Sequence, residues 1–174
     1  SASTSGSEPY TNFFGIMPQQ SASYYNRGTT GSDGAMTYYG QNLDGSGYTE
    51  MFTVTGVGGY YVSKEDRYEF EGYEYSHGAA DREKCAGAKF YYVREKNLIE
   101  FHSGNKTVRT ESVLYQLPLS VYSDYTNPPP PDNVEEGSHK FVGWYLNPEC
   151  TRPADLATMT MPASNLALYA KWEP

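Results

Sequence analysis

The closing stretch of the chain, residues 141–174, constrains its fold more than any other part. It reads FVGWYLNPECTRPADLATMTMPASNLALYAKWEP, with Gly-Trp-Tyr at 143–145 and a Thr-Met-Pro-Ala turn at 160–163. Residues 166–172 then alternate, so that Leu, Leu, Ala and Trp side chains share one face and Ala, Tyr and Lys share the other. This period of two predicts a closing β-strand with one buried face.

A weaker copy of the same pattern lies upstream, at residues 70–96 (FEGYEYSHGAADREKCAGAKFYYVREK). In an alignment of the two copies, residues 70, 72 and 73 match residues 141, 143 and 144. Residues 90–92 likewise match residues 168–170. The first copy is shorter between its two strands, and a tyrosine-rich β protein can repeat such a pattern by chance. Repetition on this scale nevertheless favours two related units in series.

The closing stretch resembles the Listeria–Bacteroides repeat, the module also found as the B-repeat of internalin-like surface proteins. That family ends its unit with F-x-G-W-Y, a turn containing cysteine or threonine, and T-M-P-A-x-x-L-x-L-Y-A-K-W. Nearly every position of that pattern is met here, and Y-Y-x-R at residues 91–94 resembles the junction that precedes a unit. The resemblance implies a mainly β chain, built from two tandem β-grasp-like units with short helical or irregular crossovers.

Three regions follow from these patterns. Residues 1–34, rich in Ser, Thr, Gly, Asn and Tyr without a sustained period, are expected to form an irregular N-terminal segment. Residues 35–96 are expected to form the first, divergent unit, and residues 97–174 the second. Alternating runs predict hairpins with turns at 44–47 and 103–105.

The crossover of the second unit has two distinct parts. LPLSVYSDY, at residues 117–125, has apolar residues spaced by three and is predicted to hold a short helix. NPPPP, at residues 127–131, is predicted to be a stiff extended loop, because proline fixes φ and cannot donate to a strand ladder. The predicted core residues are Phe70, Phe90 and Tyr92 in the first unit, and Phe141, Trp144, Leu168 and Trp172 in the second.

Charge and hydropathy exclude several kinds of partner. Asp plus Glu number 21 against 13 Lys plus Arg, a net charge of −8, which disfavours nucleic acid. No basic run suggests anionic lipid, and no apolar stretch is long enough to span a membrane. No secretion or sorting signal is recognisable, so in a surface protein those parts are expected outside this stretch.

Two cysteines, Cys85 and Cys150, do not define a disulfide framework. If the two units stack end to end, the two residues are about one domain apart and stay unpaired, since a bridge needs Cα atoms within about 7 Å. A bridge would instead require the two units to fold back on each other. The sequence leaves both arrangements open and favours unpaired thiols.

No motif assembles a catalytic or metal site. None of the three histidines pairs with another His or Cys at metal spacing, and residues 44–50 lack the alternating oxygen ligands of a calcium loop. Acidic residues at 65–71 are better explained as edge protection than as a glycosidase pair. No G-x-S-x-G motif occurs. We therefore expect no enzymatic activity, no cofactor and no metal.

Adjacent tyrosines offer a different possibility. Neighbours in a strand point to opposite faces, so one member of each pair can stay exposed and supply binding surface. Tyr24, Tyr25, Tyr38 and Tyr39 are the candidate binding residues on this argument. The simpler alternative is that both faces of a thin β unit need covering.

The leading functional hypothesis is a non-enzymatic segment of a large surface protein, acting as a stalk or adhesion module at the cell wall of a Gram-positive bacterium. The family resemblance implies this, and composition permits it. The rivals are a carbohydrate- or protein-binding module that uses exposed tyrosines, and an accessory domain of a secreted hydrolase. The expected partner is a host or bacterial surface protein or a glycan, with no membrane contact by this segment of a longer chain.

Overall fold

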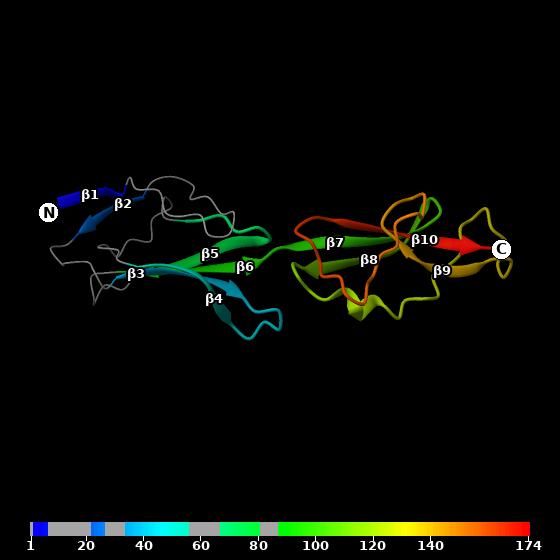
Figure 1. Ribbon diagram of the computed structural model, residues 1–174, viewed down its shortest axis with the longest axis horizontal. Coiled ribbons are helices and arrows are strands. Elements are labelled where there is room, and N and C mark those ends of the chain that lie inside the picture. The colour runs from blue at the N-terminus through cyan, green and yellow to red at the C-terminus, as the bar shows by residue number, and fades with distance from the viewer. Residues whose placement is uncertain (1, 7–21, 27–33, 56–66, 81–86) are drawn as a thin grey trace. The chain divides into compact units, whose positions relative to one another are not determined.

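The fold is mainly β and divides into two compact units. The computed structural model describes residues 2–6, 22–26, 34–55, 67–80 and 87–174 (Figure 1). Strands make up 52% and helix 3% of the described residues, which confirms the predicted class. The chain divides between Arg94 and Glu95, two residues before the predicted boundary. Each unit is described separately below.

The first unit contains a four-stranded sheet and a separate two-stranded ribbon. The sheet is formed by β3 (Ala35–Gln41), β4 (Tyr48–Thr55), β5 (Tyr73–Ala80) and β6 (Ala88–Arg94). The ribbon pairs β1 (Ala2–Gly6) with β2 (Ala22–Asn26) in antiparallel register. The expectation of an irregular segment over residues 1–34 is therefore wrong for these two strands, and its other residues up to 33 lie outside the described part.

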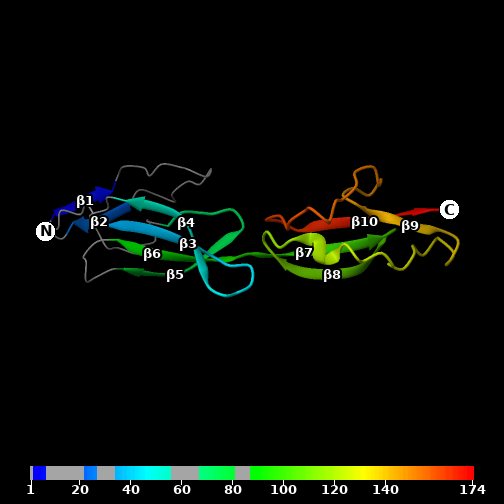
Figure 2. The same cartoon turned by 60° about the horizontal axis from the view of Figure 1, so that its bottom comes forward.

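The second unit contains one four-stranded sheet and one short helix. Its strands are β7 (Lys96–Ser103), β8 (Lys106–Leu114), β9 (Lys140–Tyr145) and β10 (Leu166–Glu173). The 3-10 helix η2 (Leu119–Tyr122) lies within the predicted helical stretch and beside the sheet (Figure 2). Its Leu119 is buried in the core of this unit.

The two sheets have the same strand order. The orders are β4-β3-β6-β5 and β8-β7-β10-β9, each with two antiparallel pairs around a central parallel pair. In both four-stranded sheets, the first strand in sequence order forms a hairpin with the second, and the last strand returns to lie beside the first. The predicted duplication is thus visible in the topology, and nothing in it conflicts with a β-grasp-like unit.

The pairing register corrects one part of the sequence alignment. Phe90 pairs with Tyr38 as Leu168 pairs with Phe101, so the closing strands were aligned correctly. Trp144, however, pairs with Ala170, and the corresponding Tyr92 pairs with Tyr75 rather than Tyr73. Tyr75 therefore occupies the position of Trp144. In this strand the sequence alignment is shifted by two residues, because Phe70 precedes β5 whereas Phe141 lies within β9.

The core of the first unit is almost wholly aromatic. Tyr38, at its centre, stacks on Phe90 with ring centroids 4.7 Å apart and meets the edge of Tyr68 at 4.9 Å. The buried members of this core are Met36, Tyr38, Phe52, Tyr68, Phe70, Ala88, Phe90 and Tyr92. Because aromatic side chains bury large areas and prefer edge-to-face contacts, a small sheet can fill its core with few residues.

The core of the second unit mixes aliphatic and aromatic residues. It lies between the sheet and two crossovers, the first at residues 115–139 between β8 and β9 and the second at residues 146–165 between β9 and β10. Its buried members are Ile99, Phe101, Val113, Leu119, Trp144, Leu156, Met161, Leu168 and Ala170. Phe141 and Trp172, which were expected in the core, are partly buried and pack against it. Met161 fixes the second crossover, since its N–H donates to the Leu117 carbonyl at 2.9 Å and its own carbonyl accepts from Gln116 N–H at 2.8 Å.

Candidate binding surfaces

The tyrosines proposed as binding residues fall into different environments. Tyr38 has no exposed surface and stands at the centre of the first core, so its assignment to a binding surface is wrong. The alternation of β3 then turns Tyr39 outward, where it is half-buried. Tyr24 and Tyr25 belong to β2, and the placement of their side chains lies outside the described residues.

The outward face of the first sheet carries a row of rings, one from each strand. Tyr91 on β6 stacks on Tyr39 of β3 at 5.1 Å with 14° between the planes, and on His77 of β5 at 4.6 Å with 11°. Tyr48 of β4 meets Tyr91 edge-on at 4.9 Å. The tyrosines are half-buried and His77 is exposed. We call these four residues the outer aromatic row of the first unit.

The second unit repeats this row at equivalent register positions on three of its strands, β7, β10 and β9. His102 and Tyr169 pair across β7 and β10 as Tyr39 and Tyr91 pair across β3 and β6, and their rings stack at 5.2 Å. Tyr145 pairs with Tyr169 on the other side, and the Lys171 ammonium lies 5.3 Å from the Tyr145 ring centre. The arrangement thus recurs although the residue types change.

The geometry of the outer row limits what it can bind. Stacked rings on neighbouring strands cover one another's faces, and such cross-strand aromatic pairs stabilise a sheet by about 0.2–1 kcal/mol each. Ring edges and phenol hydroxyls therefore face solvent more than ring faces do. The row can supply hydrogen bonds and edge contacts, but it is not a flat aromatic platform.

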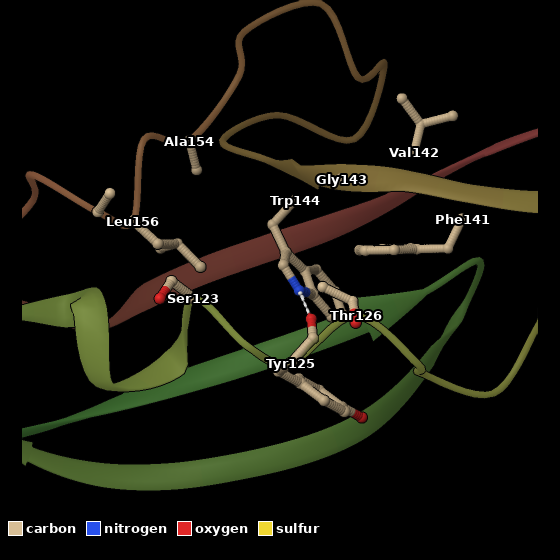
Figure 3. A pocket seen from close by; sticks show the side chains of 10 residues that line it. Ser123, Tyr125, Thr126, Phe141, Val142, Gly143, Trp144, Ala154 and Leu156 are labelled. Carbon is tan, nitrogen blue, oxygen red and sulfur yellow. Dashed lines mark hydrogen bonds between the residues drawn. The ribbon is translucent and has the colours of Figure 1, made fainter.

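A hollow of about 310 Å³ opens beside Trp144 in the second unit (Figure 3). Three segments form it: β9, the end of the first crossover after η2, and the second crossover at residues 154–157. The lining residues are Ser123, Tyr125, Thr126, Phe141, Val142, Gly143, Trp144, Ala154, Leu156 and Ala157. None of them is charged, so the hollow suits an uncharged group.

Trp144 forms the floor of this hollow and is held firmly. Its indole N–H donates to the Tyr125 carbonyl oxygen at 2.7 Å, as the dashed line in Figure 3 shows. The Tyr125 ring stacks on the indole at 5.4 Å, and Phe101 meets it edge-on at 4.9 Å. The residue is 6% exposed. A ligand in the hollow would therefore touch little of the indole face.

Beside the hollow, β9 forms one edge of its sheet. The second crossover covers part of that edge, since Leu146 N–H donates to the Arg152 carbonyl at 2.8 Å and Ala154 N–H to the Trp144 carbonyl at 3.0 Å. Among the described residues, nothing but β10 bonds to the backbone of residues 140–143. The uncovered stretch of the edge therefore starts where the hollow begins.

In the described residues, hydroxyl groups contact imidazoles at three places, namely Ser76 at His77, Thr107 at His102 and Ser138 at His139. No three His, Cys, Asp or Glu side chains of the described residues are grouped as metal ligands would be. Cys150 is a free thiol whose Sγ lies 3.7 Å from the carbonyl oxygens of Pro148 and Ala170, and burial raises its pKa. Its thiolate is thus disfavoured. Cys85 lies outside the described part of the chain.

Sequence reasoning missed most of the outer aromatic row. It singled out adjacent tyrosine pairs, but Tyr91, His77 and Tyr169 were not among the candidate binding residues. The signal was present in the closing strand, because Phe90 and Tyr92 face the core and Tyr91 between them must face outward. The hollow could not be found in this way, since it depends on three segments that are distant in sequence.

Comparison with known protein families gives a match within the second unit. Residues 98–171 match the Listeria–Bacteroides repeat domain, which confirms the resemblance drawn from the sequence. This family suggests a repeat segment of a surface protein. No curated protein matches the chain. Within the described residues, no helix has the length and apolar character needed to cross a membrane.

Proposed function

We propose, starting from the Listeria–Bacteroides repeat in residues 98–171, that this chain is a non-enzymatic segment of a large bacterial cell-surface protein. The observation that carries the proposal is the repetition of one strand order in both units, of which the second matches the family. Only Glu95 separates the last strand of the first unit from the first strand of the second. A chain that adds units in this way suits a stalk at the wall of a Gram-positive bacterium.

A surface and exchange experiment tests this role in the intact protein. Antibodies raised against residues 95–174 should bind intact cells, and an unrelated spacer of equal length should restore the display of the flanking regions when it replaces both units. Failure of the antibody to reach intact cells would contradict a surface location. Failure of the replacement, with normal surface display, would contradict a pure spacer.

The second candidate function is a binding module, and the outer aromatic rows favour it. Their half-buried tyrosines, together with the exposed His77 in the first unit and the half-buried His102 in the second, could contact a protein or glycan. Tyr39→Ser together with Tyr91→Ser should then reduce adhesion while the melting temperature shows that the unit still folds. The matched control is Thr49→Ser, an exposed position on β4 outside the row. Unchanged adhesion would show that the row does not bind a partner and only stabilises the sheet.

The absence of enzymatic activity is also part of the proposal. A hydrolase needs a nucleophile, a base and an orienting group within hydrogen-bond reach. Thr107 Oγ1 lies 3.2 Å from His102 Nδ1, but Glu100 lies 3.9 Å from His102 Nε2 and is too distant to orient the imidazole by a hydrogen bond. Burial also raises the thiol pKa of Cys150. The purified chain should turn over no ester, peptide, glycoside or phosphate substrate, with or without divalent metal. Turnover that follows the protein through two further purification steps would refute this.

A further inference from the structure

The hollow beside Trp144 has properties that a purely structural unit does not require. It opens between β9 and the crossover at 154–157, and Val142 at its lip is 43% exposed. Exposed apolar side chains of this size are few among the described residues, where Leu98 and Val121 are the others. Val121 lies on η2, two residues before the lining residue Ser123. Val142 therefore places exposed apolar surface where the hollow opens.

The chemistry of the lining excludes several occupants. No carboxylate, ammonium or guanidinium lines the hollow, so a charged ligand would lose water without gaining a partner. A sugar ring would need an open aromatic face, but Trp144 is 6% exposed and Tyr125 stacks on it. An aliphatic side chain fits better, since it needs only uncharged walls such as Leu156 and Ala157.

The strand edge supplies the polar part of the site. The ladder between residues 152–154 and β9 ends at Trp144, and the edge beyond it has no further partner among the described residues. An added strand can continue a ladder from the point where the previous one leaves the edge. Val142 forms an irregularity in the pairing with β10, which limits such an addition to a short segment.

We propose that the hollow and the adjoining edge of β9 form a docking site for a short, extended, uncharged peptide segment of a partner protein. The peptide pairs its backbone with residues 140–143 and inserts one aliphatic side chain between Phe141, Leu156 and Ala157. Ser123 and Thr126, on the opposite wall, offer hydroxyls to its backbone. A docking site of this kind goes beyond the proposed spacer role and does not depend on that role.

A peptide titration of the complete chain tests the site. The probe is acetyl-Thr-Thr-Leu-Thr-Thr-amide, and its counterpart has Asp in place of Leu. Two-dimensional NMR should show saturable shifts at Gly143 and at the Trp144 indole N–H with the Leu peptide and not with the Asp peptide. Ala157→Glu and Thr126→Glu, from opposite walls at exposed positions, should each weaken binding at least about tenfold.

Ser164→Glu is the matched control, because this exposed residue belongs to the second crossover but not to the lining. It should leave both the shifts and the melting temperature unchanged. Shifts that are equal for the Leu and Asp peptides, or that persist in both wall variants, would overturn the proposal. So would concentration-dependent shifts of the same resonances without peptide, since they would assign the hollow to a second copy of the chain.

Discussion

At the scale of single residues, Trp144 connects three segments of the second unit. It lies on β9, its N–H bonds to the crossover at Tyr125, and its ring meets Phe101 of β7. Truncation of a buried aromatic residue costs about 3–5 kcal/mol, and a small domain has about 5–15 kcal/mol in total. Trp144→Ala should therefore bring the second unit close to unfolding, as measured by urea denaturation.

Trp172 provides the readout, because both tryptophans of the chain belong to the second unit. Its fluorescence should report a shifted midpoint in Trp144→Ala. Trp144→Phe retains a ring but loses the bond to Tyr125 and part of the buried indole volume, so we expect a smaller loss of about 1–3 kcal/mol. Equal midpoints for the wild type and the Ala variant would disprove a central role for this residue.

Tyr92 gives the first unit a dependence on alkaline pH. Its hydroxyl donates to the Tyr68 carbonyl at 2.7 Å and accepts from the Tyr68 N–H at 3.2 Å, and burial raises its pKa well above the usual value of about 10. A raised folded-state pKa stabilises the fold below the unfolded pKa. That contribution is lost as pH rises, because the unfolded tyrosine ionises while the folded one stays protonated.

Tyr92→Phe should remove this contribution. The free energy of unfolding should fall above about pH 10 in the wild type, with a slope of up to about 1.4 kcal/mol per pH unit from this proton, and more gently in the variant. At neutral pH the variant should be less stable by about 1–2 kcal/mol, since two backbone groups of Tyr68 lose their partner. Denaturation curves by circular dichroism at several pH values measure both effects. If the free energy of unfolding fell with pH equally in the wild type and the variant, the predicted role of Tyr92 in the pH dependence would be contradicted.

Individual residues also show where a sequence stops predicting its structure. Tyr38 and Tyr39 are identical in type, and only the pairing of β3 decides which one enters the core. Phe141 and Trp144 are three apart, a spacing that simple alternation would put on opposite faces. The irregularity at Val142 brings them together, with ring centroids 5.2 Å apart, so the family pattern predicted a shared core that periodicity could not.

At the scale of elements, the proline-rich loop is fastened to the β7–β8 turn. Pro128 is buried, and Lys106 Nζ bonds to Asp132 at 2.9 Å. A Cβ built on Gly104 would lie 2.8 Å from the Pro131 Cβ, and Gly104 itself has a φ of +63°. The loop therefore packs closely over a turn that only a residue without a side chain can form easily.

Gly104→Ala should destabilise the second unit through both strain and contact. Gly137→Ala is the control, because its φ is +84° but its Cβ would meet nothing within 4 Å. We expect about 1–2 kcal/mol from the backbone in both variants, and about 1–3 kcal/mol more for Gly104→Ala from overpacking. Urea midpoints by Trp fluorescence measure the difference. Equal losses of stability in the two variants would show that the proline-rich loop moves away from the added methyl group without a measurable cost.

Elements that depend on local pattern were predicted well. The hairpin turns, the closing strands and the short helix follow from alternation and turn residues, and the structure confirms each of them. The insertion of β10 between β7 and β9 was not predicted, because parallel partners are chosen by contacts distant in sequence. The pairing of β1 with β2 was missed for a related reason, since neither strand alternates apolar and polar residues.

At the scale of the whole molecule, the two units have separate cores. Among the described residues, the buried cluster of the first unit and that of the second have no member in common, and each covers its own sheet. Residues 95–174 expressed alone should therefore fold. The test is a cooperative urea transition by Trp fluorescence, with a midpoint close to that of the same unit in the full chain. A fragment without a cooperative transition would contradict the separation.

The parallel pair at the centre of each sheet has a mechanical consequence. In the second unit, β7 is the entering strand and β10 the leaving strand, and they lie side by side in the same direction. Tension applied through the two ends of this unit therefore pulls the pair lengthwise. Its hydrogen bonds share that force and must break together, instead of opening one after another. A protein tethered at one end and pulled at the other by flow would resist extension at this seam.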